Sequence, residues 1–117
     1  MTIEQFIIEY LNGALTGVSA SGSVPHPMPD KFVTVELTGS NRVDMVTTAT
    51  IAVQSWAGTR AEAAELNETV KSLMDAIISE PEISRSALES DYNYTDLSTN
   101  HPRYQAVYEI TFFIMEV

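Results

Sequence analysis

Residues 32–56 read FVTVELTGSNRVDMVTTATIAVQSW, and this stretch decides the fold. Its first six residues alternate between two sides of a strand, with Phe32, Thr34 and Glu36 on one side and Val33, Val35 and Leu37 on the other. Gly39-Ser40-Asn41 is typical of a turn. Residues 43–56 are rich in Val, Thr and Ile, which favour a long return strand. The stretch therefore predicts an antiparallel hairpin.

A helix is predicted directly after the hairpin. Thr59 and Glu62 have the spacing of a capping box, and Pro81 ends the segment. Between them one apolar stripe recurs at helical spacing, formed by Ala63, Leu66, Val70, Leu73, Met74, Ile77 and Ile78. The stripe predicts a helix that packs one side against the hairpin.

Another helix is predicted at the start of the chain. Thr2 and Gln5 form a second capping-box pattern, and Asn12-Gly13 is a usual helix stop. Apolar residues recur between them at helical spacing: Ile3, Phe6, Ile7, Tyr10 and Leu11. Residues 15–23 are rich in Gly and Ser, and they fit either a short strand or an irregular crossing. The prolines of residues 25–29 predict a stiff, extended linker.

Two strands are predicted after the second helix. Residues 83–97 fit a strand with room for a bulge, which carries Leu88, Tyr92 and Tyr94 on one face. A turn at Asn100-His101-Pro102 leads to a closing strand over residues 103–117. Apolar residues occur on both faces of this strand toward its end, which indicates cover on both sides or burial by a partner.

The order is thus helix, strand pair, helix, strand pair. It predicts one α+β domain over residues 1–117, a mostly antiparallel sheet of about four to five strands with two helices packed on one face. The other face of the sheet then meets water or another subunit.

Composition excludes several classes of function. The 117 residues contain six Lys and Arg against sixteen Asp and Glu, a net charge of −10 that argues against a nucleic-acid binder. The absence of Cys excludes disulfides, thiolate metal sites and a cysteine nucleophile. The longest apolar runs are far shorter than a bilayer span, so no membrane partner is expected. The first residues lack the positive charge of a signal peptide, which predicts a cytoplasmic site of synthesis.

Candidate chemical groups are sparse. His26 and His101 each lie beside proline, and neither belongs to a metal-ligand spacing. Asp91, Asp96 and His101 could be drawn together as an acid/base or metal cluster, but their spacing matches no calcium loop and favours a solvated loop. The glycines form no phosphate-binding pattern. We therefore predict no catalytic residues, no metal and no cofactor.

Three other groups have ordinary structural interpretations. Glu62, Glu65 and Glu68 suit the positive end of a helix dipole, although they would also suit a basic partner. Trp56 is predicted to anchor the core or its rim. A cross-strand aromatic cluster is predicted for Tyr92, Tyr94, Tyr104 and Tyr108.

Three stretches carry a resemblance to a known family. They are Pro29–Gly39, Ala49–Trp56 followed by Arg60–Leu66, and the Arg-Tyr-Gln start of Arg103–Ile110. In this order they resemble the tail terminator, or tail completion, proteins of long-tailed bacteriophages, over about four-fifths of the chain. Members often carry Gly-Gly at the hairpin tip, whereas Gly39 is followed here by Ser40.

The resemblance implies a structural protein and not an enzyme. Such proteins assemble as a six-fold ring on the last ring of the tail tube, stop tube growth and present the surface that joins the head. The implied partners are further copies of the chain, the major tail tube protein and the head-connector or neck proteins. The implied location is the tail or neck of the virion, after synthesis in the bacterial cytoplasm.

The resemblance also gives the charge and the exposed loops a meaning. A ring around passing DNA benefits from repelling phosphates, although the net charge of −10 serves solubility equally well; tight duplex binding at moderate salt would contradict the first interpretation. We expect the subunit interface to involve two segments with few reasons to be buried within one subunit, namely Pro25, His26, Pro27, Met28 and Pro29, and Gly39, Ser40, Asn41, Arg42, Val43 and Asp44.

Two alternatives stay open. One is another neck or minor tail component of similar build. The other belongs to a different class, a small hydrolase or ligand-binding domain that uses Asp96 and His101.

Overall fold

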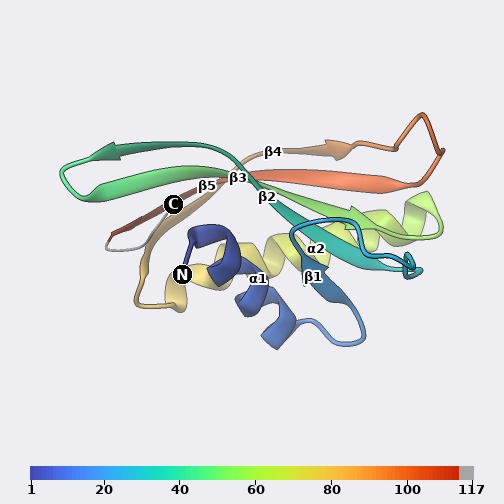
Figure 1. The fold of residues 1–117 in the computed structure, drawn as a ribbon, viewed down its shortest axis with the longest axis horizontal. Helices are drawn as coiled ribbons and strands as arrows, with labels where there is room; N and C mark the ends of the chain where they lie inside the picture. Colours follow the sequence, from blue (N-terminus) through green and yellow to red (C-terminus); the bar gives the residue numbers. More distant parts are fainter. Residues whose placement is uncertain (114–117) are drawn as a thin grey trace.

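The computed structural model describes residues 1–113 of the chain (Figure 1). The last predicted strand residues, 114–117, lie outside this range. The elements follow in the order α1 (Ile3–Ala14), β1 (Ser19–Ser21), β2 (Phe32–Val43), β3 (Val46–Trp56), α2 (Arg60–Ala76), a 3-10 turn (Ile77–Ser79), β4 (Ile83–Asn93) and β5 (Arg103–Phe113).

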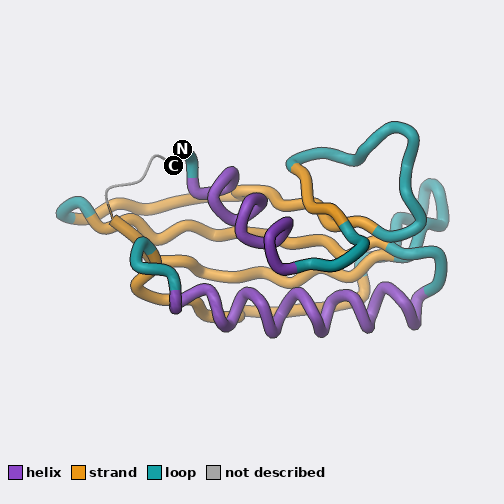
Figure 2. Tube along the Cα trace, turned by 90° about the horizontal axis from the view of Figure 1, so that it is seen from below, coloured by secondary structure: helices purple, strands orange, loops and turns teal. Residues whose placement is uncertain are grey.

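The strands form one sheet in the order β1-β2-β3-β5-β4. All neighbours are antiparallel except β1, which runs parallel to β2. Both helices lie on the same side of the sheet (Figure 2). The predicted α+β class and the single helical layer are confirmed, and residues 15–23 contain a short strand.

The core lies between the helices and the sheet. Helix α1 contributes Ile3, Ile7 and Leu11, all fully buried. Most of the predicted stripe of α2 and alternate residues of the strands complete this core, among them Ala63, Leu66, Val70, Met74, Val33, Val35, Ile51, Val53, Ala106, Tyr108, Ile110 and Phe112. The prediction was wrong for Ile78, because α2 ends at Ala76 and Ile78 is 56% exposed in the 3-10 turn. Burial of this apolar surface holds the two layers together.

Both helix starts are capped as predicted. The Thr2 side chain accepts from the Gln5 backbone N–H at 3.2 Å, and Thr59 accepts from Glu62 at the same distance. The predicted stop at Asn12-Gly13 is wrong, because α1 continues to Ala14. The Asn12 amide instead exchanges two hydrogen bonds with the backbone of Ala20, at 2.7 and 2.9 Å, and so holds β1 beside the helix.

The predicted turn at residues 39–41 is also wrong. Strand β2 continues to Val43, and the chain turns at Asp44 and Met45, whose φ angles are 50° and 69°. Two positive φ angles in succession are the mark of a type I′ hairpin, whose twist matches that of the strands. Gly39 lies instead beside a β-bulge, where the register shifts between Leu37 and Gly39.

Strand β4 is shorter than predicted and changes side. It ends at Asn93 instead of residue 97, and a bulge shifts its register between Leu88 and Ser90. Leu88 therefore lies opposite Tyr108 on the helical side, whereas Tyr92 lies opposite Gln105 on the other side. The prediction of one face for these residues was wrong because the bulge reverses the alternation.

The predicted cluster of four tyrosines is not formed. Tyr92 and Tyr94 contact each other edge-on, with ring centroids 5.8 Å apart. Tyr108 is buried under α2, where its hydroxyl donates to the Lys71 carbonyl at 3.1 Å and contacts the Asp75 carboxylate at 2.9 Å. Strand alternation places Tyr104 on the same side as Tyr108, away from the Tyr92–Tyr94 pair.

Candidate functional site

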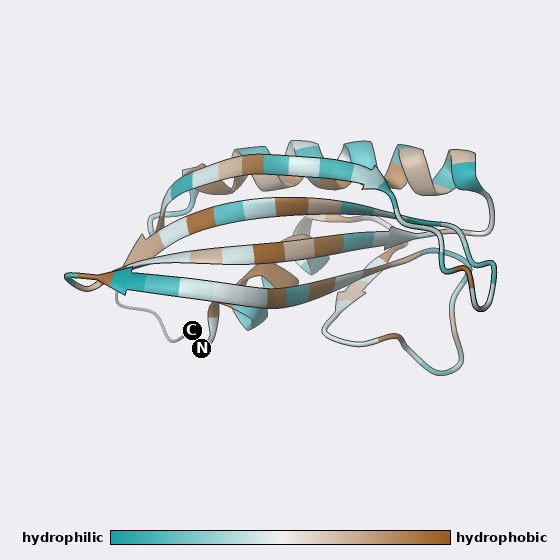
Figure 3. Ribbon diagram, turned by 90° about the horizontal axis from the view of Figure 1, so that it is seen from above, coloured by the Kyte–Doolittle hydropathy of each residue, from teal (hydrophilic) through white to brown (hydrophobic). Residues whose placement is uncertain are grey.

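The side of the sheet away from α1 and α2 is the candidate functional site, and we call it the uncovered face. Figure 3 shows its strands in front of the helices, with hydrophilic and hydrophobic bands in alternation. By register it carries every second residue of the strands, including Thr34 and Glu36 in β2, the even-numbered residues 46–56 of β3 and the odd-numbered residues 103–113 of β5.

One end of the uncovered face is apolar. Val43 pairs with Val46, and Val46 pairs with Phe113, so the three side chains form a row across β2, β3 and β5. Val43 is 61% exposed and Phe113 is 46% exposed, while Met45 in the turn is 70% exposed. We call Val43, Met45, Val46 and Phe113 the apolar tip. Phe113 is part of the doubly apolar strand end seen in the sequence.

The middle of the uncovered face carries small side chains together with one exposed ion pair. Thr48 and Thr111 share a hydrogen bond of 3.2 Å across β3 and β5. Ala52 and Val107 pair directly in the next part of the same two strands. Arg85 and Glu109 form an exposed ion pair at 3.7 Å.

A chain of hydrogen bonds crosses four strands near the other end, and we call it the polar ladder. The Trp56 Nε1–H donates to Thr34 Oγ1 at 3.0 Å, and the Thr34 hydroxyl donates to Gln54 at 2.6 Å. The Gln54 amide donates to Gln105 at 2.6 Å, and the Gln105 amide donates to the Tyr92 hydroxyl at 2.5 Å. The ladder satisfies polar groups that would be costly to leave unpaired beneath the surface.

Arg103 lies between two aromatic rings at the end of the ladder. Its guanidinium carbon is 4.7 Å from the centre of the Trp56 ring and 4.3 Å from that of Tyr94. The Arg103 Nε–H donates to the Tyr94 carbonyl at 2.6 Å, and Phe32 stacks on Trp56 at 5.2 Å. Trp56 is 4% exposed, which confirms its prediction as an anchor of the core or rim.

An open cavity of about 470 Å³ lies at this end, and we call it the end cavity. Its apolar wall includes Val24, Trp56 and Tyr94, and its charged residues are Glu36, Asp96 and Arg103. Within residues 1–113, Glu36 and Arg103 take part in no salt bridge. The end cavity therefore offers aromatic surface together with one cation and two anions, none of which takes part in a salt bridge within residues 1–113.

The structure does not bring together the two segments predicted as an interface. Residues 25–29 form a loop that bends at His26 and Pro27, so the predicted extended linker is wrong. This loop and the hairpin turn at Asp44 lie at opposite ends of the molecule (Figure 1). Residues 26–29 and 38–45 are exposed, and whether they contact a second subunit stays a prediction.

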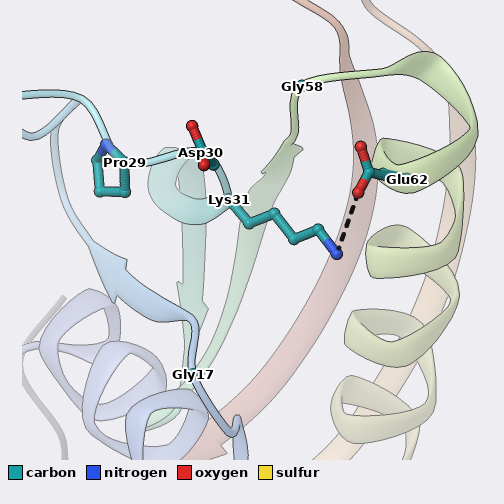
Figure 4. Close-up of a pocket in the computed structure, with 6 residues that line it drawn as sticks. All are labelled: Gly17, Pro29, Asp30, Lys31, Gly58 and Glu62. Atoms are coloured by element: carbon teal, nitrogen blue, oxygen red, sulfur yellow. Dashed lines mark ion pairs between the residues drawn. The ribbon is translucent and has the colours of Figure 1, made fainter.

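A second open cavity, of about 510 Å³, lies beside the proline loop. Figure 4 shows Pro29, Asp30 and Lys31 on one side of it and Glu62 of α2 on the other. Lys31 and Glu62 form an ion pair at 3.5 Å, so these two charges already compensate each other. In the same helix Glu68 pairs with Lys71 at 3.0 Å.

The acid/base candidates do not form one cluster. Asp91 contacts Lys71 at 3.3 Å and the Asn67 amide at 3.4 Å, on the helical side. Asp96 and His101 are joined by two backbone hydrogen bonds, of 3.0 and 3.2 Å.

The side chains of Asp96 and His101 point to different partners. The Asp96 carboxylate accepts from the Ser98 hydroxyl and backbone N–H, and these hydrogen bonds hold its pKa below the usual range. The His101 ring instead packs 5.4 Å from the Trp56 ring. In the described part of the chain, no group of three or more His, Cys, Asp or Glu residues is placed to hold a metal ion.

The ladder and the Arg103 stack were not predicted from the sequence. Two parts of the apolar tip were: Val43 belongs to a segment predicted as an interface, and the end of the last strand was predicted to be apolar on both faces. The ladder and the stack depend on the strand register, which places Thr34, Gln54, Gln105 and Tyr92 in one row and Arg103 opposite Trp56.

Comparisons with known proteins assign this chain to no family. No protein-family profile matches the chain, and no curated protein sequence is significantly similar to it. Within residues 1–113, none of the helices combines the length and the apolar character needed to cross a membrane.

Proposed function

We propose that this protein is a structural assembly protein of a long-tailed bacteriophage, which caps the end of the tail tube as a hexameric ring. In this role it stops tail elongation and forms the surface that joins the head. The observation that carries the proposal is the uncovered face, a wide sheet surface with exposed apolar side chains at its ends. Surfaces of this kind mark protein–protein contacts.

The partners follow from this role. They are other copies of the chain, the major tail tube protein and the head-connector or neck proteins, with no cofactor, no reaction and no specific nucleic-acid binding. The protein would be made in the bacterial cytoplasm and reside in the tail or neck of the virion. The residue order that resembles tail terminators and the acidic composition support the same proposal.

The runner-up is a neighbouring neck or minor tail component, which would use the same kind of surface. The enzymatic alternative has less support. Acid/base catalysis needs side chains within hydrogen-bond reach, whereas the Asp96 carboxylate binds Ser98 and the His101 ring packs on Trp56.

The proposal is tested by a stop codon in this gene in its parent phage or prophage, followed by negative-stain imaging of the induced lysate. Over-long tails without heads are expected for a terminator. Tails of normal length without heads would instead assign the neighbouring neck role. Normal infectious particles would contradict both forms of the assembly proposal.

A further inference from the structure

The two ends of the uncovered face are chemically complementary. The apolar tip exposes Val43 and Met45, and the end cavity exposes the ring of Tyr94, which is 43% exposed, above the buried Trp56. Exposed apolar surface at one end thus has an aromatic counterpart at the other. Burial of both against each other would remove apolar area from water.

The charges show the same complementarity. Arg42 and Asp44 flank Val43 at the hairpin turn, and Glu36 and Arg103 lie in the end cavity. Arg42 lies on the helical side of β2, where its Nε–H donates to Thr47 Oγ1 at 3.1 Å. None of these four charged side chains takes part in a salt bridge within the described residues. The hairpin turn therefore carries one cation and one anion, whereas the end cavity carries one cation and, with Asp96, two anions.

The two ends are too far apart to meet within one subunit. The eleven residues of β3 separate them, a span of roughly 30 Å for an extended strand. Figure 1 also shows that the sheet twists along its length, so that the ribbons of β2 and β3 overlap in this view. Because of this twist, the two ends of the face point in different directions, which disfavours one flat face-to-face dimer that engages both ends at once.

We infer that the hairpin turn of one subunit inserts into the end cavity of the next copy of the chain, head to tail. Met45 and Val43 then contact the exposed ring of Tyr94, Arg42 meets Glu36, and Asp44 meets Arg103. A head-to-tail contact of two different surfaces forms a closed ring when its rotation closes. The inference rests on the proposed function, because it names the contact that builds the proposed ring.

Disulfide crosslinking tests this contact directly, since the chain has no Cys. Met45 is replaced by Cys at the tip and Ser23 by Cys at the rim of the end cavity, in one chain. Oxidation is expected to give a ladder of covalent oligomers beyond the dimer. Each single variant can give covalent dimers at most. The matched control, M45C with S72C on the exposed side of α2, should give no such ladder.

Charge reversal adds a second measurement. R42E alone and E36R alone are each expected to weaken the ladder of the cysteine pair at least several-fold, and the two reversals together should restore it. Both residues are exposed, so folding should be kept. No ladder from the M45C/S23C chain, covalent dimers alone, or a ladder equally strong in both single reversals would overturn the inference.

The two proposals fail in different ways. If crosslinking gives no ladder while the stop-codon phage makes over-long tails, the head-to-tail contact is wrong and the assembly role stands. If the ladder forms while that phage makes normal particles, the contact exists and the assembly role is wrong.

Discussion

The two faces of the sheet differ in what covers their side chains. On the helical side, Ile51, Tyr108 and Ile110 are fully buried by α1 and α2. On the uncovered face, Thr34 and Gln54 are shielded by their neighbours and by the polar ladder. The helices cover the first face within one subunit, whereas the second face leaves apolar side chains exposed at both of its ends. The comparison teaches that alternate residues of the same strands can build the core on one side and leave apolar side chains exposed on the other.

Truncation of an aliphatic side chain is expected to give the largest difference between the two faces in the free energy of unfolding. Ile110→Ala empties a fully buried position and should lower the free energy of unfolding by about 2–5 kcal/mol. Val107→Ala, on the other side of the same strand, is partly exposed and should cost less than about 1 kcal/mol. Urea titration of both variants measures the difference, and equal losses would break the comparison.

Loss of a hydrogen bond from the polar ladder is expected to lower the free energy of unfolding by a smaller amount. Thr34→Val leaves the Trp56 Nε1–H without an acceptor at a buried site, and should cost about 1–3 kcal/mol. The control is Thr50→Val on the same face, which is partly exposed and lies outside the ladder, and which should cost well under about 1 kcal/mol. Denaturant unfolding followed by tryptophan fluorescence compares the two. A Thr34 variant as stable as its control would show that the ladder contributes nothing.

The stacking of Arg103 between Trp56 and Tyr94 should contribute less to stability than the polar ladder. Arg103→Lys loses the planar group between Trp56 and Tyr94, and should cost about 0.5–2 kcal/mol with a change in tryptophan emission. Arg85→Lys keeps an exposed ion pair with Glu109 and serves as the matched control. Unchanged stability and tryptophan emission in the Arg103 variant would show that the stack does not contribute to stability.

Alkaline pH provides a test of the covered face alone. Burial, and next the Asp75 carboxylate, raise the pKa of the Tyr108 hydroxyl above its usual range. Burial and Glu80 likewise raise the pKa of Tyr10. Both hydroxyls must lose their protons more readily in the unfolded chain, so stability should decline as pH rises above about 10. Tyr108→Phe should make this decline shallower in thermal melts between pH 9 and 11, and an unchanged slope would contradict the assignment.

Local sequence patterns predicted most of the fold and little of the site. Capping residues such as Thr2 and Thr59 and the α2 stripe act within a few residues, so they are visible in the chain itself. The hairpin turn was misplaced because Gly39 marks a bulge, while the turn uses Asp44 and Met45. Register depends on such bulges, and a shift by one residue moves a side chain to the other face. The ladder and the Arg103 stack therefore required the structure.

The central claim of the proposal is that the uncovered face builds an assembly, and complementation tests it most directly. A phage with a stop codon in this gene is supplied with the wild-type chain, with V43D/M45E at the apolar tip, or with the control I78E at an exposed apolar site of the helical layer. Negative-stain images should show normal joined tails with the wild type and I78E, and over-long or headless tails with V43D/M45E. Normal joined tails with V43D/M45E, folded and equally abundant, would contradict the account.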